Sequence, residues 1–247
     1  MTSKIVQQHL LEALETLGRR IRRLRRAVRK LVRENGLLKA RCAELEIRCA
    51  ELEELSTTDP LTELSNLRDY QRNGKKLLRS IQWECLNSSQ KEPSSIIYVD
   101  IDNFKPVNDY LGHDFGDRIL RALSEILRDS TRRNDVVARI GGDEFVIILH
   151  RKSVGEAIRF AQRIAYKFQE TSQGIIPQDS SIAPSISFGI YSFTGESMGS
   201  DPPEKEALDT ITKNAEKCLR KAKNKGKGLI EWLTEHNKDS GTEKCLP

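Results

Sequence analysis

Four carboxylates stand where apolar runs end or begin. Asp100 and Asp102 close the run SSIIYVDID, and Asp143 and Glu144 open the run EFVIILH after a pair of glycines. If the two runs are neighbouring strands, these side chains meet at one edge of a sheet. Hard oxygen ligands of this kind suit Mg²⁺, which typically keeps one or two carboxylates together with substrate phosphates. The pattern predicts a metal and phosphate site at that edge.

The turn that precedes the second acidic pair is stripped of side chains at Gly141 and Gly142. Paired glycines weaken a strand, but they leave bare backbone against which a phosphate chain can lie. An ordinary hairpin turn is the simpler alternative for this stretch taken alone. Neither GxxxxGK[ST] nor GxGxxG follows a predicted strand, so a P-loop or Rossmann nucleotide site is not supported.

Strands that alternate with helices, plus one tight hairpin, must position these residues. This order predicts an α/β sandwich with a mixed sheet, helices on its faces and loops at one edge. The strands are expected at 95–102, 135–140, 144–150, 184–193 and 228–233. The helices are expected at 66–86, 104–110, 115–130, 153–170 and 206–224, with loops at 87–94 and 194–204.

Composition limits the class of protein. The chain has 247 residues, 37% of them apolar, which supports a sizeable core. No apolar run approaches the roughly 18 residues of a membrane span, and no signal peptide begins the chain, so we expect a cytoplasmic location. The five cysteines form no CxxC pair, which is typical of reduced thiols. Residues 1–55 carry 13 Lys and Arg against 8 Asp and Glu, whereas residues 56–247 carry 28 of each, so the larger part lacks the surplus typical of nucleic-acid binding.

A heptad repeat runs through the N-terminal segment. Its d positions hold leucine at 10, 17, 24, 31, 38, 45 and 52. Ile21 and Val28 and the polar Asn35 occupy a positions, which favours a parallel two-stranded coil and fixes its register. We expect residues 1–55 to form a coiled-coil stalk that makes a homodimer through residues 10–55. A single amphipathic helix packed on its own globule is the alternative.

The run RRIRRLRRAVRK at 19–30 invites comparison with a DNA-binding basic zipper. Heptads lie on both sides of the run, so most of its arginines fall on the outer faces of the coil, whereas the basic region of that class precedes its zipper. We therefore expect a solvated face and no nucleic-acid partner. Arg20 would face Arg25 of a second chain, which should loosen the coil here or attract an anionic surface, and an unknown regulator could bind this face.

Four motifs, in order, resemble the GGDEF family of diguanylate cyclases. They are DPLTELSN at 59–66, DIDNFKPVNDYLGHDFGD at 100–117, RRNDVVARIGGDEF at 132–145 and AEKCLRKAKNKGK at 215–227. The match spans residues 56–233 and leaves 234–247 as a tail that we expect to be disordered. The resemblance implies a palm-like fold, related to adenylyl cyclases and polymerases, that condenses two GTP into cyclic di-GMP and two pyrophosphates.

The resemblance also implies roles for the acidic residues. Asp100, the backbone carbonyl of Ile101 and Asp143 would hold Mg²⁺ or Mn²⁺, and Glu144 would complete the centre as a further ligand or the proton acceptor. A 3′-hydroxyl must attack an α-phosphorus in line, and two metal ions can lower its pKa and neutralise the leaving pyrophosphate.

Further residues match the family's substrate site. Asn108 and Asp117 match its guanine-reading pair, because a carboxylate can accept from guanine N1–H and N2–H while an amide serves the purine's N3 and exocyclic edge. The resemblance places Phe104 beside the base, and it brings three lysines to the phosphates: Lys105, Lys223 and Lys227.

Arg132 and Asp135 form an RxxD that matches the family's product-inhibition site. The arginine would grip guanine N7/O6 or phosphate in a bidentate manner, and the aspartate would take the guanine donors, so feedback inhibition by cyclic di-GMP is expected. The sequence departs from the family pattern at Glu63 for Gly, Leu67 for Arg, Arg220 for Tyr and Lys227 for Arg.

The product is a two-fold symmetric ring, so one GTP per subunit requires two sites that face each other about a two-fold axis. The parallel stalk would supply that axis. A catalytically silent receptor for GTP or cyclic di-GMP is the alternative function, although its acidic turn would be expected to be degenerate. A DNA-binding zipper protein is the remote alternative.

Overall fold

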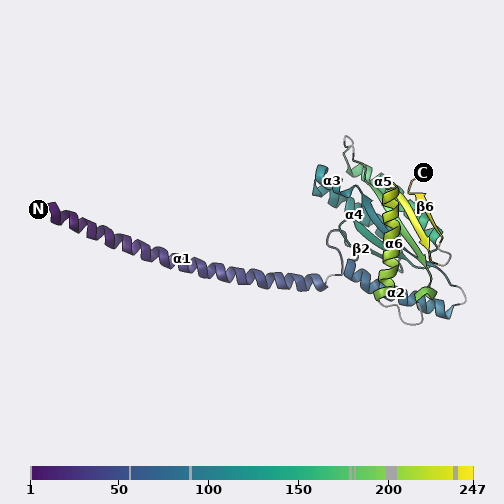
Figure 1. The fold of residues 1–247 in the computed structure, drawn as a ribbon, viewed down its shortest axis with the longest axis horizontal. Helices are drawn as coiled ribbons and strands as arrows, with labels where there is room; N and C mark the ends of the chain where they lie inside the picture. Colours follow the sequence, from purple (N-terminus) through teal and green to yellow (C-terminus); the bar gives the residue numbers. More distant parts are fainter. Residues whose placement is uncertain are drawn as a thin grey trace. The chain divides into compact units, whose positions relative to one another are not determined.

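The computed structural model describes residues 2–55, 57–88, 91–177, 180, 182–198, 205–235 and 239–246. The chain divides into two compact units, Met1–Ser56 and Thr57–Pro247. In the first unit, helix α1 (Thr2–Leu55) is one uninterrupted helix (Figure 1). The helical part of the stalk prediction is therefore seen directly, whereas its pairing with a second chain stays a prediction.

The described apolar side chains of α1 are uncovered in the single chain. Leu24, Leu31 and Leu38 are 65%, 63% and 66% exposed, and all three occupy d positions of the heptad. Apolar surface of this extent, repeated along one stripe, is typical of a surface that packs against another helix.

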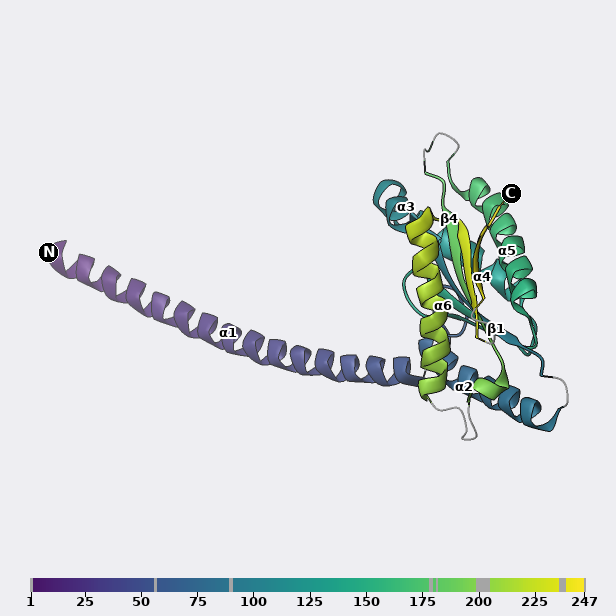
Figure 2. The same ribbon diagram turned by 45° about the vertical axis from the view of Figure 1, so that its right-hand side comes forward.

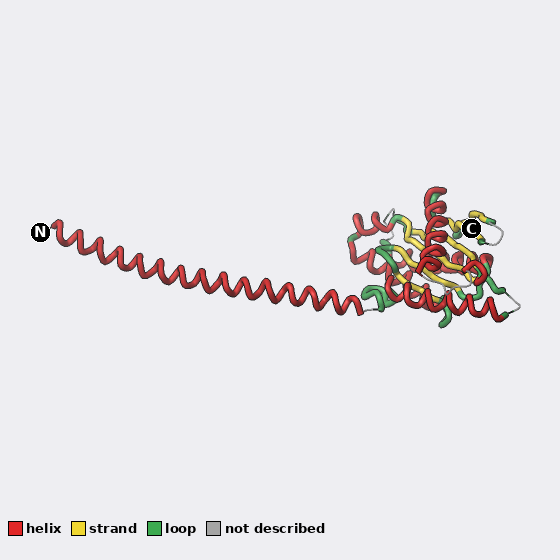
Figure 3. Tube along the Cα trace, turned by 60° about the horizontal axis from the view of Figure 1, so that its bottom comes forward, coloured by secondary structure: helices red, strands yellow, loops and turns green. Residues whose placement is uncertain are grey.

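The second unit is built on a six-stranded sheet in the order β2-β3-β1-β4-β5-β6. The strands are β1 (Ser94–Asp102), β2 (Val136–Arg139), β3 (Glu144–Leu149), β4 (Ser185–Phe193), β5 (Leu229–Thr234) and β6 (Ser240–Lys244). Strand β4 pairs with β5 in parallel, and the other neighbours are antiparallel, so the sheet is mixed as predicted. In Figure 3 these strands lie between the helices of this unit.

Helices cover both faces of the sheet. One face packs against α4 (His113–Ser130) and α5 (Val154–Ile175), and α3 (Phe104–Leu111) leads into α4. The other face packs against α2 (Leu67–Asn87) and α6 (Lys205–Lys225). Figure 2 shows α6 and α5 on opposite sides of the sheet. Odd-numbered β1 residues such as Ile97 and Val99 enter the first core, and even-numbered residues such as Ile96 and Tyr98 enter the second.

The sequence prediction was wrong at the C-terminus. Ser240–Lys244 forms β6 on the edge of the sheet, antiparallel to β5, and Cys245 behind it is 5% exposed. The segment SGTEK carries no apolar alternation, because an exposed edge strand needs none, so its pairing partner alone identifies it. Within the expected loop at 194–204, Gly195–Met198 forms a short 3₁₀ helix, η1.

Candidate functional site

The acidic pairs meet at the end of β1. In the antiparallel β1–β3 ladder Asp100 lies directly opposite Glu144, so both side chains point to the same face of the sheet. Asp100 is 7% exposed. Burial raises its pKa to about 6; the ammonium group of Lys223 opposes this rise, and the negative charge of nearby Asp143 assists it. Lys223 places one positive charge against Asp100, but the neighbouring acids bring more negative charge than it balances, and a divalent cation would relieve the remainder.

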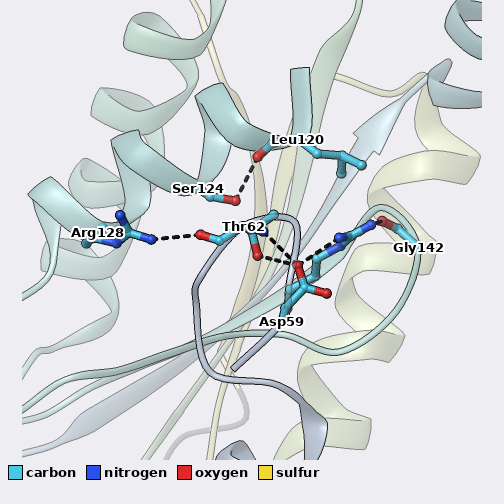
Figure 4. A network of polar contacts seen from close by, with 7 residues as sticks. Asp59, Thr62, Leu120, Ser124, Arg128 and Gly142 are labelled. Atoms are coloured by element: carbon cyan, nitrogen blue, oxygen red, sulfur yellow. Dashed lines mark hydrogen bonds and ion pairs between the residues drawn. The ribbon is translucent and has the colours of Figure 1, made fainter. Parts of the chain in front are cut away.

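Arg139, the last residue of β2, holds the turn before β3. Its Nε and Nη2 donate to the Gly142 carbonyl at 3.1 and 2.7 Å, and its Nη1 donates to Asp59 Oδ1 at 2.9 Å. The same Asp59 oxygen accepts from the backbone N–H and the hydroxyl of Thr62 (Figure 4). Burial tends to raise the Asp59 pKa, but the hydrogen bonds from Thr62 and Arg139 outweigh it and lower the pKa. The DPLT segment therefore holds the acidic turn in place.

The two glycines of the turn serve different ends. A Cβ at Gly141 would lie 2.7 Å from Glu144 Oε2, so the missing side chain makes room for the Glu144 carboxylate. A Cβ at Gly142 would meet nothing within 4 Å. The fold itself does not require a glycine at 142, which leaves open backbone beside the acidic residues.

Asn108 lies in the second half of α3, close to the start of α4. Its Oδ1 is buried and has no hydrogen-bond partner among the described residues. A Cβ at Gly116 would lie 1.9 Å from that oxygen, so the glycine of GHDFGD is what lets the amide occupy this position. Sequence reasoning missed Gly116, although the motif contained it. Asp117, the next residue of α4, is half-buried. A buried acceptor without a donor is costly unless a ligand completes it.

Two of the three predicted lysines reach this edge. Lys223 of α6 forms an ion pair with Asp100, and Lys227 Nζ donates to Asn103 Oδ1 at 2.9 Å. Lys105 is exposed on α3, and no contact from it to the acidic residues is seen. Phe104 is partly buried and packs against the core under α3. The structure thus gathers acids, lysines and the amide around one end of β1.

The residues present fit a divalent cation that also binds substrate. Asp100 Oδ1 lies against Lys223 but has no well-formed hydrogen bond within the described residues. The described chain holds no group of three or more His, Cys, Asp or Glu side chains in metal-binding geometry. Mg²⁺ needs no such cage, because one or two carboxylates, a backbone carbonyl and substrate phosphates suffice. An ion here would depend on the nucleotide for part of its coordination.

Comparison with known proteins identifies the family. The family model "Diguanylate cyclase, GGDEF domain" matches residues 56–228. The chain belongs to the GGDEF diguanylate cyclase family. It is 37% identical over 139 residues to diguanylate cyclase DosC of Escherichia coli K12, a match covering 56% of this chain and 28% of DosC. It is 32% identical over 184 residues to diguanylate cyclase A of Treponema denticola, covering 74% of this chain and 46% of the relative. The chain thus spans less than half the length of either relative.

The fold agrees with this family. The coiled coil and GGDEF domain of DgcB from Caulobacter crescentus, solved with c-di-GMP, superposes with a TM-score of 0.57 at 23% identity, over 81% of this chain and 98% of that one. The palm-like α/β fold that the resemblance implied is therefore confirmed. No helix in the described ranges is long and apolar enough to cross a membrane.

The RxxD of this GGDEF protein lies at the far end of the β2–β3 hairpin from the acidic turn. Asp135 accepts from the backbone N–H of Arg132 at 2.8 Å and of His150 at 3.0 Å. A cavity of about 220 Å³ opens beside it. Its cationic lining includes three side chains that sequence reasoning missed, because only the fold brings them to this place: Lys152, which precedes α5, and Arg159 and Arg163 of α5.

Three of the residues that depart from the GGDEF pattern have well-defined local surroundings. Glu63, where the family usually has Gly, adopts a left-handed conformation with φ of 58°. Leu67 is the first residue of α2, whose N-terminus Asn66 caps by accepting from the Asp69 N–H at 3.0 Å. Arg220 forms an ion pair with Glu216 on the same helix, at 2.5 Å.

Proposed function

We propose that this chain is a diguanylate cyclase that condenses two GTP into cyclic di-GMP and two pyrophosphates. The observation that carries the proposal is the buried carboxylate of Asp100, opposite Glu144 and beside Lys223, together with the Asn108 side-chain oxygen, which has no hydrogen-bond partner among the described residues. Lys223 supplies one positive charge at this place, whereas Asp100, Asp143 and Glu144 bring more negative charge, which a divalent cation would balance.

The acidic residues would hold the metal. Asp100, the carbonyl of Ile101, Asp143 and Glu144 are the ligands that we assign to Mg²⁺ or Mn²⁺. When bound, the ions lower the pKa of the attacking 3′-hydroxyl and neutralise the leaving pyrophosphate. Glu144 lies where Gly141 leaves room for its carboxylate, and we assign it the role of proton acceptor.

The base and phosphates would be held by side chains of α3, α4 and α6 and of the turn that follows α6. Asn108 Oδ1 would accept from the guanine exocyclic amine, and Asp117 would accept from N1–H and N2–H. Phe104 would flank the base. The phosphate charge would be met by three lysines, Lys105, Lys223 and Lys227, with the Gly142 backbone beneath the chain of phosphates.

One chain supplies half of the reaction site, so turnover requires two chains. The product ring is two-fold symmetric, and each chain would bring one GTP. The exposed leucines of α1 support pairing through residues 10–55, which raises the effective concentration of facing domains. The arginine-rich face of α1 points outward in such a coil, and it is the surface that we assign to any regulator.

Product inhibition would act at Arg132 and Asp135. The Arg132 guanidinium is exposed and suits guanine N7/O6 or phosphate, and Asp135 suits the guanine donors. Arg159 and Arg163, which line the same cavity, would add charge against the phosphates of cyclic di-GMP.

The test is to incubate the purified chain, cleared of bound nucleotide, with GTP and Mg²⁺ and to identify products by chromatography and mass. Cyclic di-GMP from GTP, and no cyclic product from ATP, is the expected result. A dimer that binds GTP and makes no cyclic di-GMP would contradict the proposal and favour a nucleotide receptor.

A further inference from the structure

Asp102 is bonded quite differently from Asp100, although the two stand in one tripeptide, DID. It is 1% exposed, and three donor groups surround its carboxylate: the hydroxyls of Ser185 and Ser187 and the backbone N–H of Gly228. Ser185 Oγ donates to Oδ2 at 2.8 Å, and Ser187 Oγ lies 2.9 Å from both oxygens. The backbone N–H of Gly228 donates to Oδ2 at 2.9 Å. A carboxylate buried among three donors in this way is poorly placed to bind a metal ion or a nucleotide.

The Gly228 contact joins Asp102 to a strained turn. Gly226, Lys227 and Gly228 have φ of 142°, 65° and 58°, three successive residues in the left-handed half of the backbone map. A lysine seldom adopts this conformation, so the surrounding contacts must hold it there. The backbone N–H of Lys227 donates to the Ala222 carbonyl of α6 at 3.3 Å, and the N–H of Gly228 donates to Asp102 Oδ2 and also lies 3.1 Å from Ser187 Oγ.

The turn carries Lys227 to the end of β1. Its Nζ reaches Asn103, the residue that follows Asp102, at 2.9 Å. A second restraint comes from the C-terminus, where the backbone N–H of Cys245 donates to the Gly228 carbonyl at 3.1 Å. The lysine therefore stands on a turn that is held from β1, from β4 and from the segment after β6.

We infer that Asp102 is a positioning residue for the nucleotide phosphates. Its buried carboxylate fixes the Gly226–Gly228 turn, and the turn aims Lys227 at the phosphates of a bound nucleoside triphosphate. This rests on the proposed function for the identity of the nucleotide. The two aspartates of DID therefore have different roles. Asp100 faces Lys223 and the acidic turn, where we place the metal ion, whereas Asp102 holds the turn that carries Lys227.

The test is a double-mutant cycle of Asp102→Asn and Lys227→Ala. An asparagine turns one oxygen into a donor, which opposes Ser185, Ser187 and Gly228. We would measure KM and kcat for GTP, and the Kd of 3′-deoxy-GTP, which binds but cannot cyclise. Asp129→Asn, an exposed carboxylate on α4, is the matched control.

Asp102→Asn is expected to raise KM and Kd by about tenfold with little change in kcat, and by less than about twofold when Lys227 is already alanine. Equal effects in both backgrounds, or a loss of kcat at unchanged Kd, would overturn the inference. Cyclic di-GMP binding at Arg132 and Asp135 should be unchanged, which reports an intact fold.

If Asp102→Asn does not fold, Ser187→Ala decides the matter. It removes one hydroxyl and keeps the Asp102–Gly228 bond, and a rise of about threefold in Kd is expected only where Lys227 is present. An unchanged Kd would overturn the inference. A parent chain that binds 3′-deoxy-GTP without making cyclic di-GMP would refute the proposed cyclase while this binding cycle still tests Asp102.

Discussion

Helix α1 and the acidic end of β1 are both left incomplete by the single chain, but in opposite ways. Along α1, leucines at d positions such as Leu31 and Leu38 are more than half exposed. At the end of β1, Asp100 Oδ1 is buried against Lys223, and Asn108 Oδ1 is buried without a hydrogen-bond partner among the described residues. Exposed apolar surface is completed by another apolar surface, whereas buried acceptors are completed by a cation or a donor.

The two regions suit different binding partners. The exposed leucines of α1 suit a second helix, and the acidic end of β1 suits the metal ion and the guanine of the proposed function. On this account the two features are linked, because a two-fold symmetric product needs two copies of the incomplete site.

The largest effect on turnover is expected from a substitution in the acidic turn. Asp143→Ala should lower cyclic di-GMP formation by about 10³-fold, because it removes charge that holds the metal and phosphates. Asp135→Ala is the matched acidic change at the other end of the hairpin. It should keep turnover and lose inhibition by added cyclic di-GMP. Turnover assays with and without product separate the two, and equal losses in both variants would contradict the division of roles.

The leucines at the d positions of α1 can be replaced without changing any residue of the acidic site. Leu31→Glu with Leu38→Glu should lower turnover per chain by about 100-fold at nanomolar enzyme, since the facing domains lose their shared tether. Binding of 3′-deoxy-GTP should be unchanged. Leu37→Glu is the matched control, because Leu37 is as exposed as Leu38 in the single chain but lies at a c position. Mass measurement by light scattering should give a monomer for the double variant and a dimer for Leu37→Glu.

The link between the DPLT segment and the acidic turn should matter less. Asp59→Asn removes a part-buried ion pair with Arg139 and should lower the free energy of unfolding by about 1–2 kcal/mol. Turnover should fall by about tenfold, because the Gly142 carbonyl is anchored through Arg139. Because folding lowers the Asp59 pKa below 3.8, its stabilisation is present above that pH and is lost as pH falls further. Acid unfolding curves of parent and variant should therefore converge at low pH, and a constant gap would contradict this origin.

The smallest effect is expected at Glu63. Glu63→Gly should raise the free energy of unfolding by about 0.5–1 kcal/mol, because glycine adopts φ of 58° without the steric cost of a Cβ. Glu63→Ala keeps the Cβ and loses the ion pair with Arg128, so it should bring no gain. Thermal unfolding measures both variants, and a stabilising alanine would show that backbone strain is not the cause.

The sequence predicted the elements that carry strong local signals. The hairpin around the glycine turn and the strand ending at Asp102 lie within one residue of their expected bounds. Helix α5 runs on to Ile175, beyond the predicted end at 170, because its apolar face continues into the core.

What sequence reasoning missed depends on contacts between distant segments. Asp100 and Asp102 are the same residue type two positions apart, and only their partners on β3 and β4 make one available and the other saturated. Gly116 matters through its distance to Asn108, and β6 is a strand only because β5 offers an edge. Spacing along the chain does not carry such information.

The most direct test is the dependence of turnover per chain on enzyme concentration. Cyclic di-GMP formation from GTP and Mg²⁺ would be followed across the range in which light scattering shows the mass to double. The account predicts that turnover per chain rises with concentration and levels off where the dimer is complete. Constant turnover per chain while the protein remains a monomer would contradict it.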